Sequence, residues 1–192
     1  RVGDPMSEQE RWAVWHDAQK KAKTAAEIYQ HSTKMSTETQ ANVMTLAMNR
    51  SESTTDPLHI RNFGDNEMQT LVAVAPLVQM QKLQELQLGH EIGVEGITTF
   101  ALAVAGGSLP QLQILTLSYN KIGDDGMKKF AAIGSGLSQL IELSLSNNDI
   151  GDDGIYEFVK ASAKGALPRL ELLDLSKNKI EFNIAIEQGA LP

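Results

Sequence analysis

Leucine recurs along residues 83–175 in a pattern that predicts short strands at a nearly constant period. Four segments read L-x-x-L-x-L and begin at residues 83, 112, 140 and 170, with spacings of 29, 28 and 30 residues. The second and third leucines of each segment are two residues apart, so both point to the same side of a strand. Four copies of one pattern predict stacked repeats that share a parallel sheet, with these leucines in the interior.

A helix is predicted after each strand. The pattern G-x-x-G, followed by apolar residues at helical spacing, begins at Gly93, Gly123 and Gly151. A looser copy begins 29 residues upstream at Gly64, and the strand before it, around Leu58, lacks the full leucine pattern. This copy is interpreted as a degenerate terminal repeat, because terminal repeats of a stack are atypical.

Polar residues at fixed places are expected to support the turns. Asparagine follows the last leucine of segments two to four by three residues, and its amide both donates and accepts hydrogen bonds, which predicts a ladder of Asn120, Asn148 and Asn178. Glu91 takes this place in the first segment, where we expect looser packing or a different turn. The pairs 124–125 and 152–153 are both Asp-Asp and are expected to cap the helices that they begin.

These repeats resemble leucine-rich repeats of the ribonuclease-inhibitor type, which also occur in NOD-like receptors and Ran GTPase-activating proteins. The resemblance covers about residues 57–192. It implies an α/β leucine-rich repeat solenoid, with short parallel strands on the concave face and helices on the convex face. It also implies that the concave face binds a protein partner, and it supplies no catalytic residues.

The chain is predicted to divide into an N-terminal helical arm or cap, residues 1–55, and a leucine-rich repeat domain, residues 56–192, with one degenerate and four recognisable repeats. Apolar spacing predicts arm helices over about residues 8–31 and 37–49. The arm either covers the open edge of the degenerate repeat or docks into another subunit through Trp12 and Trp15. Residues 189–192 repeat the G-A-L-P of residues 165–168, which indicates either a shortened cap or, with more support, an array that continues.

Outward-facing positions between the leucines, and two residues after the last leucine of each segment, are the candidate partner-binding residues. They are Glu85, Gln87, His90, Ile114, Thr116, Tyr119, Glu142, Ser144, Asn147, Leu172, Asp174 and Lys177. Among them, Ile114, Tyr119 and Leu172 are expected to be the anchors, because a few large side chains carry most of the binding energy of an interface. The alternative is that all twelve are ordinary exposed strand residues.

Composition and residue spacing argue against several other classes of function. The 24 acidic and 17 basic residues give a net charge of −7, which argues against a nucleic-acid partner, and cysteine is absent. The four histidines lack zinc-site spacing, and the aspartate pairs suit helix starts better than a calcium loop, so we expect no metal, no cofactor and no enzymatic activity. No apolar run is long enough to predict a transmembrane segment.

Three functional classes remain open. The first is a protein–protein interaction module or scaffold, whose partner the sequence does not identify. The second is a structural accessory subunit of a large assembly, anchored by the N-terminal helices, and the third, by resemblance alone, is a regulator of a small GTPase. The absence of cysteine fits an intracellular, cytoplasmic location, while a chain that begins with Arg1 leaves an organelle open.

Overall fold

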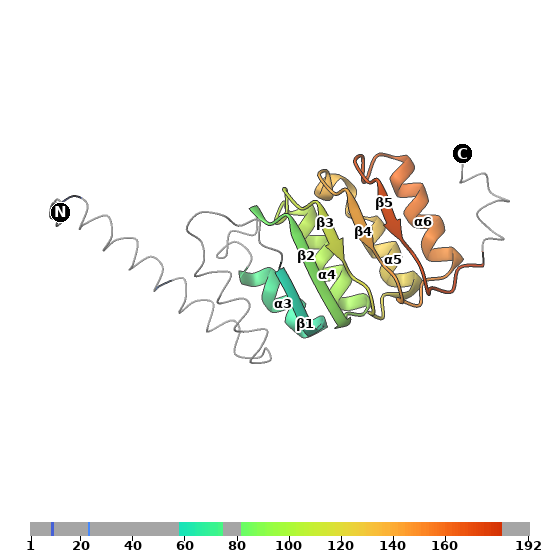
Figure 1. Cartoon of the computed structure of the whole chain (residues 1–192), viewed down its shortest axis with the longest axis horizontal. Coiled ribbons are helices and arrows are strands. Elements are labelled where there is room, and N and C mark those ends of the chain that lie inside the picture. The colour runs from blue at the N-terminus through green and yellow to red at the C-terminus, as the bar shows by residue number, and fades with distance from the viewer. Residues whose placement is uncertain (1–8, 10–22, 24–57, 75–81, 182–192) are drawn as a thin grey trace, which may run out of the picture.

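The computed structural model describes residues 58–74 and 82–181, together with the single residues Gln9 and Lys23 (Figure 1). The two predicted arm helices lie almost wholly outside the described residues, as do Trp12, Trp15 and residues 182–192. The division at residues 55 and 56 therefore stays a prediction.

Five parallel strands form one sheet whose spatial order follows the chain. They are β1 (Leu58–Gly64), β2 (Glu85–Glu91), β3 (Ile114–Thr116), β4 (Glu142–Ser144) and β5 (Leu172–Asp174). Strands β2 to β5 coincide with the four leucine segments, and β1 coincides with the degenerate copy. The predicted parallel sheet is confirmed.

One layer of helices covers one side of this sheet (Figure 1). It contains α3 (Asp65–Val74), α4 (Val94–Ala105), α5 (Gly123–Ala131) and α6 (Asp152–Ala163), with a short 3-10 turn η2 (Gly134–Leu137) after α5. Each α-helix packs against the next one along the chain. The repeating unit is therefore a strand followed by a helix, as the sequence predicts.

The second and third leucines of the first three segments form the core between the two layers. Leu86, Leu88, Leu115, Leu117, Leu143 and Leu145 are all 0% exposed. In the fourth segment, by contrast, Leu173 is 37% exposed and Leu175 is partly buried. Interior leucines are confirmed for the central repeats, and burial weakens at β5 because no described strand pairs with its outer edge.

The asparagine ladder is confirmed as a set of bonds between neighbouring repeats. Each Nδ2 donates to the carbonyl of the last leucine of its own segment and to the same carbonyl one repeat earlier. The distances are 3.1 Å and 2.9 Å from Asn120 to Leu88 and Leu117, 2.7 Å and 3.0 Å from Asn148 to Leu117 and Leu145, and 2.9 Å for both bonds from Asn178 to Leu145 and Leu175.

At Glu91 the structure shows a different turn, which was one of the two expectations for this position. Strand β2 runs on to Glu91, which pairs with Gly64 of β1, and both strands are seven residues long where β3 to β5 have three. Packing under this region is tight, since Ile60 and Phe63 of β1 are 1% and 0% exposed. A different local turn, rather than looser packing, therefore accompanies the missing asparagine.

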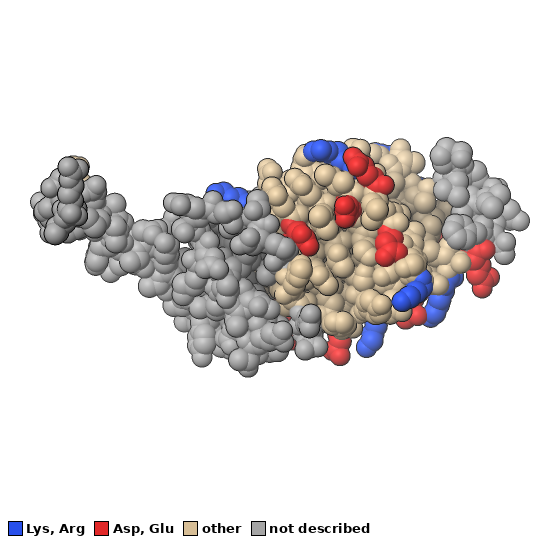
Figure 2. Space-filling model, in the orientation of Figure 1, with Lys and Arg blue, Asp and Glu red and all other residues tan. Residues whose placement is uncertain are grey.

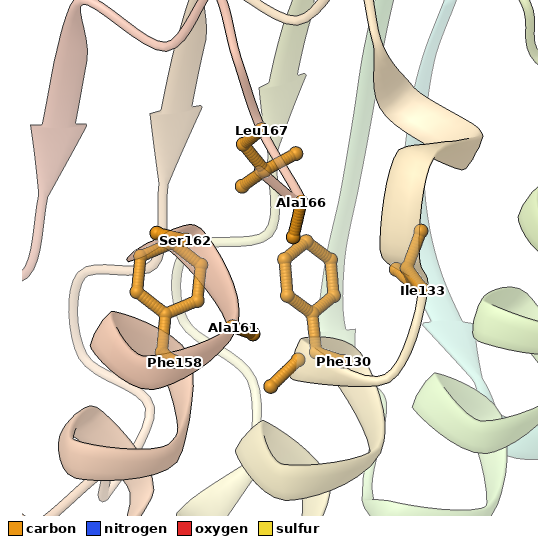
Figure 3. A pocket seen from close by; sticks show the side chains of 8 residues that line it. Phe130, Ile133, Phe158, Ala161, Ser162, Ala166 and Leu167 are labelled. Carbon is orange, nitrogen blue, oxygen red and sulfur yellow. The ribbon is translucent and has the colours of Figure 1, made fainter. Parts of the chain in front are cut away.

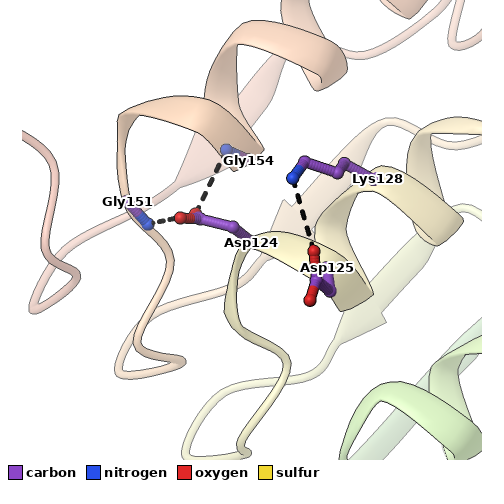
Figure 4. Close-up of polar contacts among 5 residues, drawn as sticks. All are labelled: Asp124, Asp125, Lys128, Gly151 and Gly154. Atoms are coloured by element: carbon purple, nitrogen blue, oxygen red, sulfur yellow. Dashed lines mark hydrogen bonds and ion pairs between the residues drawn. The ribbon is translucent and has the colours of Figure 1, made fainter.

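The aspartates that begin the helices cap the helix of the next repeat and not their own. Asp124 Oδ1 accepts hydrogen bonds from the backbone N–H of Gly151 (2.6 Å) and of Gly154 (3.1 Å) (Figure 4). Asp65 does the same to Gly93 (2.7 Å) and Gly96 (2.9 Å). The prediction of self-capping is wrong, because neighbouring helix N-termini lie side by side and the carboxylate reaches across the gap.

This cross-repeat cap also explains the second glycine of the G-x-x-G pattern. A Cβ atom added to Gly154 would lie 2.7 Å from the Asp124 Oδ1 atom, which is closer than van der Waals contact allows. Any larger residue would push the carboxylate away from the N–H groups that it caps. The glycine therefore keeps room for the neighbour's carboxylate.

Val94 interrupts the series of caps. It holds the place of Asp65, Asp124 and Asp152 in its own repeat and has no acceptor for the start of α5. The backbone at the start of α5 differs from that at the starts of α4 and α6. Gly123 has φ +59°, whereas Gly93 and Gly151 both have φ −105°.

The altered turn also leaves a buried acceptor without a partner. Ile92 N–H donates to Asn120 Oδ1 at 2.9 Å, and Ile150 N–H donates to Asn178 Oδ1 at 3.1 Å. By this pattern Ile122 should donate to Asn148 Oδ1, yet that buried oxygen has no hydrogen-bond partner among the described residues. We attribute both departures to the missing carboxylate at Val94.

Replacing Val94 with aspartate should restore the cap and stabilise the protein. An N-terminal cap contributes about 0.5–2 kcal/mol, so Val94→Asp should raise the free energy of unfolding by an amount in that range. Val94→Ala is the matched control, because it removes the same side chain and adds no acceptor. Denaturant titration compares the three proteins, and an equal response of the two variants would contradict this account of the cap.

Candidate partner-binding surface

The side of the sheet away from the helices is the candidate site, and we name it the strand face. All four α-helices lie on the other side of the sheet, so the outward side chains of β1 to β5 are left uncovered by described elements (Figure 1). None of the twelve predicted partner-binding residues is buried. Strand register places eight of the twelve on this side of the sheet, as the alternation predicts, and the other four lie at or just beyond the strand ends.

Strand register arranges eight of these residues in two rows that run across the strands. The acid–apolar row contains Glu85, Ile114, Glu142 and Leu172, and the polar row contains Gln87, Thr116, Ser144 and Asp174. Leu172 is 53% exposed, Glu142 is exposed and Ile114 is partly buried. Acidic and apolar side chains thus alternate from one strand to the next along the first row.

A chain of hydrogen bonds fixes part of the polar row. The hydroxyl of Ser144 lies 2.8 Å from that of Ser118 and donates to Asp174 Oδ2 at 3.1 Å. The backbone N–H of Ser176 donates to Asp174 Oδ1 at 3.0 Å. That backbone bond is the largest cause that lowers the pKa of Asp174, and the hydroxyls of Ser176 and Ser144 and the charge of Lys177 lower it further. The Asp174 carboxylate is therefore held ionised and oriented.

The remaining four predicted residues form a third row, which we name the turn row. It contains His90, Tyr119, Asn147 and Lys177. One lies near the end of β2 and the other three lie just beyond β3, β4 and β5. The backbone φ values of Tyr119, Asn147 and Lys177 are 60°, 56° and 56°, in the left-handed region that an aromatic residue rarely adopts. The N–H of Tyr119 donates to Ser146 O at 2.9 Å, which ties this conformation to the next repeat.

Tyr119 is held between two neighbours and remains half exposed. Its ring centroid lies 6.5 Å from that of His90, and Lys177 Nζ lies 5.8 Å from it on a cation–π contact. The tyrosine is 49% exposed. An aromatic ring that is already oriented loses little conformational entropy on binding, which suits an anchor.

Negative charge predominates on the strand face. Among the twelve residues there are three carboxylates, at positions 85, 142 and 174, and one lysine, Lys177. Figure 2 shows acidic atoms over the middle of this face and basic atoms toward its rim. The carboxylate of Glu85 has a histidine beside it, because His59 Nε2 lies 3.3 Å from Glu85 Oε1.

His59 is a residue of the strand face that the sequence reading missed. It pairs with Gln87 in the register of β1 and β2, so it extends the polar row by one strand. The signal was present in the alternation of Leu58, His59 and Ile60. It was missed because this segment lacks the leucine pattern that marks the other strands.

The helix side offers a different kind of hollow. A small apolar pocket lies between α5 and α6, and the rings of Phe130 and Phe158 line it with centroids 6.4 Å apart (Figure 3). Its other lining residues are Ala131, Ile133, Ala161, Ser162, Ala166 and Leu167. No charged side chain enters this pocket, so it resembles a packing gap between repeats more than a reactive site.

Two other kinds of feature are absent from the described residues. Residues 58–74 and 82–181 contain no group of three or more His, Asp or Glu side chains that could hold a metal ion. Within those same ranges no helix is both long and apolar enough to cross a membrane.

Comparison with protein families gives one result. Residues 109–131 and 138–159 match the family model described as Leucine Rich repeat, and these stretches contain β3 with α5 and β4 with α6. None of the curated proteins compared with the chain matches it. The chain therefore carries leucine-rich repeats in an α/β repeat fold, and such repeats generally mediate protein–protein interaction without catalysis.

Proposed function

We propose that this chain is a non-catalytic protein-binding module or scaffold that holds its partner on the strand face. The observation that carries the proposal is the uncovered sheet surface, on which Leu172 is 53% exposed and Tyr119 is 49% exposed and braced by its neighbours. A few large side chains carry most of the binding energy of an interface, and these two are accessible to a partner. The matched repeats support the same function.

We also propose that the repeats are of the ribonuclease-inhibitor type and form a solenoid. The spacing of 28 to 30 residues supports this assignment, as does the full helix between successive strands. The strand face would then be the concave surface of the solenoid. Each repeat adds one strand to that surface, so partner choice depends on the rows and not on one loop.

The double variant Tyr119→Asp/Leu172→Asp should lose the partner while it keeps the fold. Both side chains are about half exposed, and aspartate tolerates the left-handed backbone at position 119, so the core is untouched. We expect at least a tenfold drop in native partner captured from cell extract by the immobilised protein, measured by quantitative mass spectrometry.

Leu102→Asp is the matched control for this experiment. Leu102 is 71% exposed on α4, on the other side of the sheet, so the same change should leave capture unaffected. Circular dichroism checks that all variants are folded. Capture by the double variant at the level of the wild type would place the binding site elsewhere.

A further inference from the structure

We propose that the strand face binds an α-helix of its partner, that this helix lies across the strands, and that successive turns present basic and apolar side chains in alternation. The proposal rests on the protein-binding function of the same face and names the chemistry of the partner. It is carried by the acid–apolar row, by the spacing of its members and by the charge of the face.

The free carboxylate of Glu142 defines the basic positions of the partner. Within the described residues no hydrogen bond or ion pair engages this side chain, and it stands between Ile114 and Leu172 in the row. A cation that reaches Glu142 brings the neighbouring parts of the partner over these two apolar side chains. Apolar groups at those places would bury them, and burial of apolar surface drives association.

The spacing of the row fits a helix. Neighbouring strands lie about 4.8 Å apart, so three intervals from Glu85 to Leu172 span about 14 Å. Three turns of an α-helix span about 16 Å, and three intervals on one face of an extended strand span about 20 Å. A helix therefore stays in register with all four residues, whereas an extended segment is out of register by about one strand.

The alternation also gives the direction in which the helix lies. Along single strands the outward pairs are Glu142 with Ser144 and Leu172 with Asp174, and these pairs share no common pattern. Across the strands the sequence acid, apolar, acid, apolar appears in register. A partner aligned with one strand would contact a single repeat, so it could not contact the four residues of the row in turn.

The net charge of the face supports a basic partner. Glu142 and Asp174 are not paired with a basic side chain by any ion pair among the described residues, and Asp174 is oriented by its serine neighbours. Complementary charge speeds association and selects among partners. Binding should accordingly weaken as the salt concentration rises.

A displayed helix library tests the proposal on the full chain. Four positions of a stable helical scaffold, one on each successive turn, are varied among Lys, Glu, Leu and Ser, and binders are selected on the immobilised protein. We expect the order Lys–Leu–Lys–Leu, read in either direction, to be enriched at least tenfold over Lys–Lys–Leu–Leu. The two orders have the same composition, so the comparison isolates the alternation.

Charge reversal at Glu142 shows which residue the helix meets. Selection on Glu142→Lys should replace the lysine between the two leucines with glutamate. Glu95→Lys makes the same charge change on α4, on the helix side, and should return the wild-type pattern. Leu172→Asp should abolish enrichment of the leucine at one end of the pattern.

This inference would be overturned by the absence of any enriched order, by equal enrichment of the two orders, or by an unchanged pattern on Glu142→Lys. A companion library of unstructured peptides that binds more tightly than the helices would equally overturn it in favour of an extended partner. Failure of this inference can be distinguished from failure of the proposed protein-binding function. If the helix proposal fails, the Tyr119→Asp/Leu172→Asp variant should still lose its native partner when the strand face is the binding site.

Discussion

Leu145→Ala should lower the free energy of unfolding by about 2–5 kcal/mol, the usual range for a large-to-small change in a packed core. Leu145 is 0% exposed and follows β4 in the middle of the stack, with buried Leu117 before it and Leu175 after it. Its neighbours belong to adjacent repeats and cannot all collapse into the cavity. The loss should therefore lie in the upper part of the range.

The matched control for this variant is Leu102→Ala. Leu102 is 71% exposed on α4, and alanine is a slightly better helix former, so its effect should be within about 0.5 kcal/mol of zero. Denaturant titration followed by circular dichroism measures both. Similar losses in the two variants would contradict the inward direction of the strand leucines.

The leucine pattern predicts the sheet well because each repeat faces the same local constraint. Leucines two residues apart can both be buried only on one side of a strand, and this condition places β2 to β5 without knowledge of any neighbour. Strand β1 was harder to recognise, since Ile60 and Phe63 fill its interior positions in place of leucine and its register shifts between them. Burial of the interior positions is preserved there, while the leucine pattern is not.

The capping network could not be derived from local rules. Asp124 lies at the start of its own helix, where a carboxylate is expected to act, yet it bonds glycines 27 and 30 residues later. Rules for helix ends consider one helix at a time. Once helices stack with their N-termini aligned, the next helix offers the better-placed N–H groups.

The strand face was predictable in position and not in detail. Alternation along β2 to β5 places eight of the twelve residues on the side away from the buried leucines, whereas the four at the strand ends do not follow from it. The bonds that link Ser144 to Asp174 and the contact of Lys177 with Tyr119 join residues about 30 and 60 positions apart. They depend on strand register and on turn conformation, which the spacing of leucines alone does not determine.

Asn148→Asp should be the most destabilising of the polar changes, because it replaces a buried donor with an acceptor of the same shape. Asn148 is 0% exposed, and its Nδ2 donates to the carbonyls of Leu117 (2.7 Å), Leu145 (3.0 Å) and Ser146 (3.2 Å). A carboxylate there would face three carbonyl oxygens. An uncompensated buried charge costs about 3–5 kcal/mol, and we expect a loss of stability in that range at pH 7.

The pH dependence of this loss separates charge from shape. Burial without a cation raises the pKa of a carboxyl group, so the folded state of the variant holds a proton that the unfolded state releases above about pH 4. Stability relative to the wild type should thus fall as the pH rises from 4 to 7. Asn147→Asp is the control, since Asn147 is exposed at φ 56°, a conformation that aspartate also adopts, and its stability should barely change. Equal losses in the two variants would show that the ladder does not depend on the Nδ2 donors. A loss at position 148 that does not vary with pH would show that buried charge is not its cause.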